Sequence, residues 1–115
     1  MIQRQPSRGE VWFVDLNPVL GHEQAGKRPA LVVSVDLFNN GPAGLVVVLP
    51  ITTKDKGVPF HMEIHPTEGG LTGKSFIKCE DIRSISKERL LSIAGKVTSL
   101  TMAAVEDRLR ILLNL

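Results

Sequence analysis

The chain has 115 residues, of which 43% are hydrophobic, and its 14 basic and 12 acidic side chains leave a formal net charge of +2. This length suffices for one core that buries roughly two thirds of the unfolded surface, and it leaves no room for a second domain. So small a net charge excludes a polyanion-binding surface spread over the whole molecule, so any nucleic-acid site must be local.

Short strands are predicted along most of the chain. The segments with alternating or continuous apolar residues, separated by turn-forming residues, are 10–16, 28–35, 43–51, 58–65, 75–85 and 91–97. The second and third segments are rich in β-branched residues and apolar on both faces, so we expect them to be the central strands. Pro59 limits the fourth segment to a sheet edge or to the beginning of a strand.

The period of the apolar residues changes near the C-terminus. Those that recur at three- and four-residue spacing are Met102, Val105, Leu109 and Leu112. This period predicts a helix of about three turns from Thr101, capped by Ser99 or Thr101, with Glu106 and Arg110 paired on its polar side. Strands followed by one terminal helix indicate a mainly β fold, a small, strongly bent β-barrel or pair of sheets with the helix packed on one side.

Cysteine content and apolar run length bear on the compartment. Cys79 is the single cysteine, so the chain cannot form an intramolecular disulfide, which favours a reducing compartment. The longest apolar run, 43–51, is interrupted and too short to span a bilayer, and the first ten residues lack the apolar stretch of a signal peptide. We therefore expect a cytoplasmic protein that does not enter a membrane.

Polar residues gather where the two expected central strands begin and end. Arg28 begins the second strand, and Thr52 and Thr53 end the third. The loop that joins these strands is short, so they should pair antiparallel, which places the start of one beside the end of the other. We therefore expect Arg28 to face Thr52 or Thr53.

Several cations accompany this expected rim: Lys27, Lys54 and Lys56. An arginine fork beside a hydroxyl suits a phosphate, because the guanidinium contacts two oxygens at once and stays charged near neutrality. The alternative, which the residues leave open, is that Arg28 pairs with Glu23 or Asp15 and that the threonines merely end a strand.

Three segments together resemble the MazF/PemK family of toxin endoribonucleases. They are "RGEVWFVDLNPVLGHEQAGKRPALVV" (8–33), "LPITTKDKGVPF" (49–60) and "EDIRSI" (80–85), in the order and spacing expected of that family. The resemblance implies an SH3-like barrel of the CcdB/PemK type with a C-terminal helix, forming a single toxin domain over residues 1–115. It further implies a homodimer that acts as the toxin of a type II toxin–antitoxin system.

The activity that the resemblance implies is metal-independent, sequence-selective cleavage of single-stranded RNA, an mRNA interferase activity without a cofactor. RNA supplies its own nucleophile, the 2′-hydroxyl, so the products would carry 2′,3′-cyclic phosphate and 5′-hydroxyl ends. The family's essential arginine and threonine fall on Arg28 and Thr52. The residues that resemblance and the basic rim together indicate for RNA binding are Glu23, Gln24, Lys27, Thr53, Lys54, Lys56 and Phe60.

Two other functions are weighed against the nuclease. A non-catalytic, CcdB-like gyrase-poisoning toxin would share the fold but would have no need of a phosphate site, which the Arg28 and Thr52 pair supplies. An SH3-like peptide-binding module would need a stripe of exposed aromatic residues, and only 4% of this chain is aromatic. The resemblance also implies an antitoxin, and the basic rim predicts that its binding tail is acidic and competes with RNA.

Other candidate residues have simpler interpretations. His61 and His65, four apart in a strand, would lie about 13 Å from each other, too far to share one metal ion. Cys79 is expected to be packed, and His22 to be a solvated loop residue or an RNA contact. Trp12 is expected in the core or the dimer interface, and exposed apolar residues such as Ile111 and Leu115 are expected to favour dimerisation.

Overall fold

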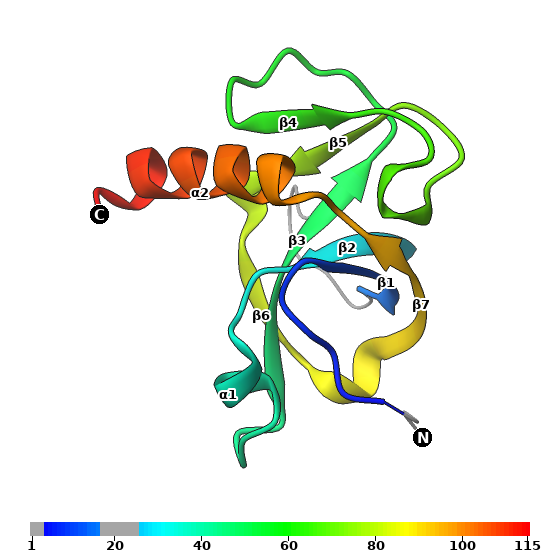
Figure 1. The fold of residues 1–115 in the computed structure, drawn as a ribbon, viewed down its shortest axis with the longest axis vertical. Helices are drawn as coiled ribbons and strands as arrows, with labels where there is room; N and C mark the ends of the chain where they lie inside the picture. The colour runs from blue at the N-terminus through cyan, green and yellow to red at the C-terminus, as the bar shows by residue number, and fades with distance from the viewer. Residues whose placement is uncertain (1–3, 17–25) are drawn as a thin grey trace.

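A computed structural model describes residues 4–16 and 26–115 (Figure 1). In these ranges seven strands form one antiparallel sheet in the order β4-β5-β3-β2-β1-β7, with β6 paired to β3 off this path. The strands are β1 (Glu10–Asp15), β2 (Lys27–Val32), β3 (Leu45–Thr52), β4 (His61–Ile64), β5 (Ser75–Lys78), β6 (Arg83–Ser86) and β7 (Leu90–Lys96). The helices are α1 (Asp36–Asn39) and α2 (Ser99–Leu113), with 3₁₀ turns η1 (Glu68–Gly70), η2 (Cys79–Asp81) and η3 (Lys87–Arg89).

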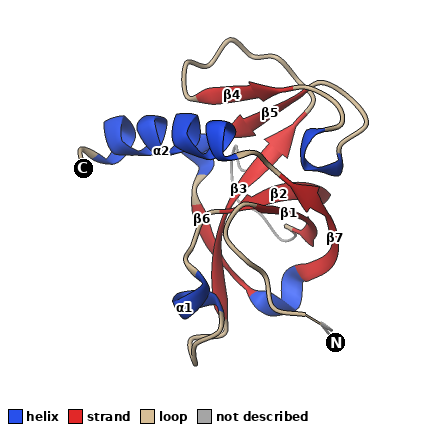
Figure 2. Ribbon diagram, viewed as in Figure 1, coloured by secondary structure: helices blue, strands red, loops and turns tan. Residues whose placement is uncertain are grey.

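β2 and β3 lie at the centre of the sheet, as their apolar sequences predict. β3 pairs with β2 along one side; on its other side its first half pairs with β6 and its last two residues pair with β5. Because β3 exchanges one neighbour for another along its length, the sheet bends sharply. Figure 2 shows β4 and β5 at one end of the molecule and β6 running toward the other. The expected mainly β, strongly bent architecture is confirmed.

The predicted strand over 75–85 is wrong, because it is two strands. β5 pairs with β4 and the end of β3, whereas β6 pairs with the first half of β3, so the chain must turn between them. The turn is η2, where the Asp81 carboxylate lies 2.7 Å from the Arg83 guanidinium and 3.5 Å from Lys78 Nζ. Alternating apolar and polar residues predict a strand, but they do not show where the chain changes from one neighbouring strand to another.

The segment after β2 also differs from expectation. It was predicted as a turn, but it contains the four-residue helix α1, whose buried Asn39 side chain donates hydrogen bonds to the carbonyls of Pro6 and Ser34. These bonds satisfy the buried amide and hold the connection between the two central strands against the N-terminal segment.

The core consists of two buried clusters on opposite faces of the sheet. One is made of Val11, Leu31, Val33, Leu49, Ile51, Ile64, Leu71, Ile77, Cys79, Val97 and Val105. The other is made of Trp12, Val14, Leu16, Ala30, Val32, Val46, Val48, Ile85 and Leu90. Adjacent residues of β1, β2 and β3 alternate between the clusters, which explains why these strands are apolar on both faces. Trp12 belongs to the second cluster, and its indole Nε1 donates to Glu10 Oε1 at 3.0 Å.

Helix α2 lies across the sheet beside β4 and β5 (Figure 1). It has 15 residues, so it is longer than predicted, and its N-cap is Thr98 rather than Ser99 or Thr101. Thr98 Oγ1 accepts a hydrogen bond from the Thr101 backbone N–H at 3.1 Å. The expected apolar face is observed, with Val105 fully buried, and the expected pair of Glu106 and Arg110 is present at 3.7 Å. Within the described residues, no helix combines the length and apolar character that crossing a membrane requires.

Candidate functional site

The rim where β2 begins and β3 ends brings together the two residues expected to act on phosphate. The expected antiparallel pairing of β2 and β3 is confirmed, and its last pair at this end joins Ala30 to Pro50. Arg28 lies two residues before Ala30, and Thr52 lies two residues after Pro50, so both are displaced by the same amount in the same direction. Residues an even number apart share a face of the sheet, so Arg28 and Thr52 occupy the same end and face.

Thr52 is positioned by contacts on both sides. It is the last residue of β3, half-buried, and it pairs with Phe76 of β5. Its Oγ1 accepts a hydrogen bond from the backbone N–H of Lys54 at 3.2 Å. This bond uses one of the two lone pairs of the hydroxyl oxygen and leaves the hydroxyl hydrogen available for donation to a bound oxygen. The local turn thus holds the Thr52 oxygen and directs what it can donate.

The loop after Thr52 carries exposed cations. Thr53, Lys54 and Lys56 are exposed, and no described carboxylate forms an ion pair with either lysine. Asp55, which lies between the lysines, turns its Oδ1 back to accept from the Gly57 N–H at 3.0 Å. Its carboxylate is therefore engaged with the loop backbone, and the loop presents positive charge.

The remaining predicted RNA contacts have different positions. Lys27 is exposed at the start of β2, opposite Asp15 of β1. Phe60 is half-buried and packs against the first core cluster. Glu23 and Gln24, like His22, lie outside the described residues.

Two residues that the sequence pattern did not indicate, Phe76 and Lys74, lie beside this rim. Thr52 and Phe76 are paired across β3 and β5, and Phe76 is paired in turn with Glu63 of β4. Lys74 Nζ lies 5.8 Å from the centroid of the Phe76 ring. No local signal in the sequence could have placed Lys74 here, because its position depends on which strand β5 joins.

The described histidine side chains form ion pairs with nearby carboxylates. The His61 side chain is buried, and its Nε2 lies 2.9 Å from Glu80 Oε2, whereas His65 falls beyond the end of β4 and pairs with Glu63 at 2.9 Å. In the part of the chain that the structure describes, no group of three or more histidine, cysteine, aspartate or glutamate residues could hold a metal ion.

Cys79 is packed, as expected. Its side chain is fully buried in the first core cluster. Burial raises the pKa of the Cys79 thiol from 9.0 to about 11; Arg108 lowers this pKa and Glu80 raises it, both by smaller amounts. A thiol kept neutral in the core is not a nucleophile near neutral pH.

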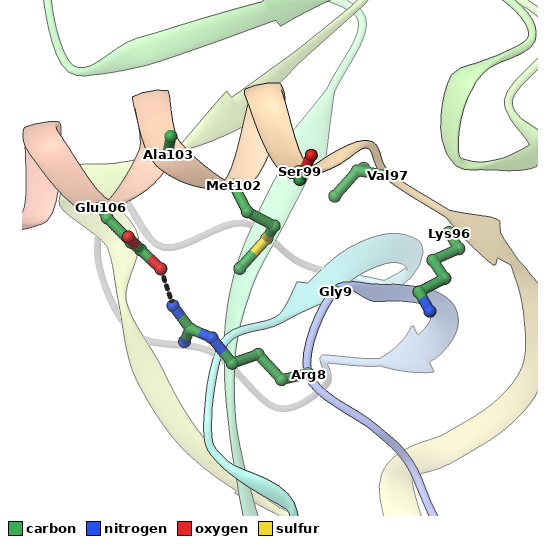
Figure 3. A pocket seen from close by; sticks show the side chains of 8 residues that line it. All are labelled: Arg8, Gly9, Lys96, Val97, Ser99, Met102, Ala103 and Glu106. Atoms are coloured by element: carbon green, nitrogen blue, oxygen red, sulfur yellow. Dashed lines mark hydrogen bonds and ion pairs between the residues drawn. The ribbon is translucent and has the colours of Figure 1, made fainter.

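A cavity of about 370 Å³ lies away from this rim. It lies between α2, the residues just before β1 and the last residue of β7 (Figure 3). Arg8 lines it and forms an ion pair with Glu106, and Arg8 also donates to the carbonyl of Val33. These partners already engage the Arg8 guanidinium, so the cavity offers no unengaged arginine to a phosphate.

Comparisons with known proteins bear on the family and the activity of the chain. Residues 7–113 match the family described as "PemK-like, MazF-like toxin of type II toxin-antitoxin system". The chain is 38% identical over 113 residues to endoribonuclease MazF9 of Mycobacterium tuberculosis, covering 94% of this chain and 96% of the relative. It is 37% identical over 109 residues to endoribonuclease EndoA of Bacillus subtilis, covering 94% of each.

Solved structures show the same fold. MazF from Deinococcus radiodurans superposes with a TM-score of 0.86 at 30% identity, covering 98% of this chain and all 100% of that one. An endoribonuclease from a mycobacterial species, solved in complex with its cognate antitoxin, superposes with a TM-score of 0.79 at 29% identity, covering 96% of each chain. The Mycobacterium tuberculosis and Bacillus subtilis relatives are endoribonucleases, which decides against the non-catalytic gyrase poison. The chain belongs to the MazF/PemK family of type II toxin–antitoxin systems and is an endoribonuclease toxin.

Proposed function

We propose that this toxin cleaves single-stranded RNA at selected sequences, without a metal ion, and that Arg28 and Thr52 act on the scissile phosphate. The observation that carries this proposal is the register of β2 and β3, which puts a guanidinium and a hydroxyl at one end and one face of the sheet. Arg28 lies two residues before the buried stretch of β2 that begins at Ala30, and Thr52 directly follows the buried Ile51 of β3, so both side chains are attached to strands anchored in the core.

The reaction that suits this pair uses the 2′-hydroxyl of RNA as nucleophile. The 2′-oxygen attacks the adjacent phosphorus as its proton leaves, the P–O5′ bond breaks, and the departing O5′ takes up a proton. The products are a 2′,3′-cyclic phosphate and a 5′-hydroxyl. Arg28 would bind two phosphoryl oxygens through its planar fork and stabilise the charge that accumulates in the transition state. Thr52 would donate its hydroxyl hydrogen to a non-bridging oxygen, since its lone pair already accepts from Lys54.

The surrounding residues would hold the strand on either side of the cleaved bond. Lys27, Lys54 and Lys56 are exposed cations suited to phosphates. Thr53 and the exposed part of Phe60 lie on the same loop and would contact sugar or base. Glu23 and Gln24 complete the proposed set from the segment before β2.

Single-turnover cleavage of a short RNA tests the proposal. Arg28→Ala should lower the rate at least ~100-fold, about 2.7 kcal/mol, with a much smaller change in RNA affinity, because the lost interaction is strongest in the transition state. Arg28→Lys should rescue poorly, since lysine lacks the two-pronged fork. Thr52→Ala should also slow cleavage, and the double variant should cost less than the sum because both groups act on one phosphate.

Two controls complete this experiment. Lys96→Ala removes an exposed cation from β7, away from the rim, and should leave the rate unchanged. EDTA should have no effect, and end-group analysis should find 2′,3′-cyclic phosphate and 5′-hydroxyl termini. A near-normal rate in Arg28→Ala, or loss of activity on chelation, would overturn the mechanism.

A further inference from the structure

We propose that Lys74 is an RNA-contacting residue of this toxin, which binds a phosphate next to the scissile one and thereby raises substrate affinity. This proposal rests on the proposed function, since it takes Thr52 as the marker of the scissile phosphate. It assigns a role to a residue on the connection between β4 and β5, outside both the rim at the start of β2 and the loop that follows β3.

Strand register places Lys74 beside the site. Thr52 pairs directly with Phe76, and directly paired residues of antiparallel strands point to the same face with Cβ atoms about 4.5–5.5 Å apart. The Phe76 ring is therefore the neighbour of the Thr52 side chain. Lys74 precedes Phe76 by two residues, and its Nζ lies 5.8 Å from the ring centroid. The ammonium thus lies against the aromatic ring that neighbours the Thr52 side chain.

The charge of Lys74 is available to a ligand. The residue is exposed, and among the described residues no carboxylate lies within ion-pair distance of its Nζ. Glu63, the nearest carboxylate in the strand register, lies 2.9 Å from His65 Nε2 instead. The contact with the Phe76 ring leaves the other side of the ammonium open to solvent.

The backbone that carries Lys74 is anchored on both sides. Before it, Gly70 packs so closely on β7 that an added Cβ would lie 1.9 Å from the Ala94 carbonyl oxygen, and Leu71 is buried. After it, Ser75 Oγ donates to the Gly73 carbonyl at 2.9 Å, and β5 begins. A lysine held in this way loses less freedom on binding than one on an unsupported loop.

This placement separates two roles on one strand of RNA. Arg28 and Thr52 share one end of β2 and β3, whereas Lys74 lies just before β5, two residues from the Phe76 that pairs with Thr52. A strand whose scissile phosphate contacts Thr52 would bring a neighbouring phosphate toward Lys74. A compact ammonium that contacts an unreacting phosphate binds ground state and transition state alike, so it lowers KM without changing kcat.

The test measures binding and cleavage separately. Binding is followed with a short RNA whose 2′-hydroxyl at the cleavage site is replaced by hydrogen, so that affinity does not depend on catalysis. Lys74→Gln, which keeps a polar side chain one bond shorter and removes the charge, should raise Kd about 5- to 20-fold. The magnitude of the slope of log K against log salt should fall by about 0.7, the value for one phosphate contact on a single strand. The single-turnover rate at saturating cleavable RNA should stay within about 2-fold.

Matched variants and substrates locate the contact. Lys74→Arg should retain affinity, and Lys96→Gln, which removes an exposed lysine of β7, should bind like the parent. Substrates with one methylphosphonate linkage should weaken the parent at each contacted phosphate, and in Lys74→Gln one position beside the scissile bond should become insensitive. Thermal unfolding of each variant checks the fold.

Three results would overturn the proposal. They are an unchanged Kd and salt slope in Lys74→Gln, a fall in the saturating rate with unchanged Kd, and an equal response at every methylphosphonate position, which would indicate a diffuse field. Failure of the proposed catalytic pair would appear instead as normal cleavage by Arg28→Ala, which leaves the binding comparison intact, so the two failures are distinguishable.

Discussion

The position of Arg28 is restricted by the residues that follow it in β2. Arg28 is followed by Pro29, whose ring fixes φ, and then by Ala30, Leu31 and Val32, which are fully buried in β2. An exposed cation is thereby attached to a rigid strand. The sequence places its charge where the chain enters the core because the core limits how far the guanidinium can move.

Burial in the core also changes the titration of the Cys79 thiol, and this change can be tested. Burial raises the folded-state pKa to about 11 from 9.0, so between these values the unfolded chain releases a proton that the folded chain keeps. The unfolded state binds fewer protons there, and stability falls as pH rises, by at most about 3 kcal/mol. Below pH 9 the thiol is protonated in both states, and the free energy of unfolding is not reduced by its titration.

Urea unfolding from pH 8 to pH 11 checks the Cys79 prediction. The difference in unfolding free energy between the parent and Cys79→Ala should shrink as pH rises, because the variant lacks the titrating group while all other groups titrate in both. A difference that stays constant with pH would contradict a raised thiol pKa. In the folded parent at pH 8, alkylation by iodoacetamide should be at least ~100-fold slower than in urea, because both the thiolate fraction and access are low.

At the scale of elements, α2 depends on a cap, Thr98, that lies one residue before the first of the two predicted positions. Thr98 Oγ1 accepts from the Thr101 N–H at 3.1 Å, and the Thr98 backbone N–H donates to Glu68 Oε2 at 3.1 Å. The cap therefore both begins the helix and joins it to η1. The chain offers three hydroxyl residues close together here, Thr98, Ser99 and Thr101, and only the backbone path decides which of them precedes the first helical residue.

Thr98→Ala should reduce the free energy of unfolding by about 1–2 kcal/mol, since it removes an N-cap acceptor. Thr98→Ser should recover most of the loss. Ser99→Ala, at the exposed first position of the helix, should change stability by less than about 0.5 kcal/mol. Urea midpoints measured at one fixed protein concentration provide the comparison. A larger effect for Ser99→Ala than for Thr98→Ala would refute the observed cap.

At the scale of the whole molecule, apolar side chains of α2 and of the residues just after it are uncovered. Leu100 and Ile111 of α2 are 79% and 73% exposed in the single chain, and Leu115, two residues after the helix, is 86% exposed. Trp12, which was expected in the core or a dimer interface, is only 4% exposed and belongs to the core. Exposed apolar residues gathered on one terminal helix favour an interface with another chain.

We expect a homodimer in solution, in which a second copy covers the C-terminal part of α2. Light scattering at micromolar concentration should give twice the mass of the chain. The paired change Ile111→Ser and Leu115→Ser should weaken association at least ~10-fold, whereas Leu37→Ser, which removes an equally exposed leucine from α1, should leave it unchanged. A strictly monomeric mass for the parent would contradict the prediction.

The whole-molecule charge bears on the antitoxin. The net charge is only +2, so the cations of the rim, Lys27, Arg28, Lys54 and Lys56, form a local positive region. We expect the antitoxin tail that binds here to be acidic, so that neutralisation weakens as salt rises and bound antitoxin excludes RNA. Fluorescence anisotropy of a labelled RNA, titrated with antitoxin at two salt concentrations, measures both effects. RNA binding that persists at saturating antitoxin would exclude competition at the rim.

Sequence alone determined the features that depend on neighbours in the chain. The β-branched runs predicted β2 and β3 as central strands, the short connection predicted their antiparallel pairing, and the three- and four-residue period predicted α2. The expectation that Arg28 faces Thr52 or Thr53 followed from that pairing, because antiparallel neighbours place the start of one strand beside the end of the other. The family motifs added the activity.

Tertiary structure alone decided the features that depend on distant partners. β3 pairs first with β6 and then with β5, which splits the expected 75–85 strand and places Phe76 beside Thr52 and Lys74 beyond it. Whether Trp12 packs inside or faces a partner, and whether His61 meets Glu80, likewise depended on which faces become covered. Alternating apolar residues indicate that one face of a strand is buried. Which strand pairs with it depends on contacts between residues far apart in the sequence, and the free energy of that pairing is shared among many such residues.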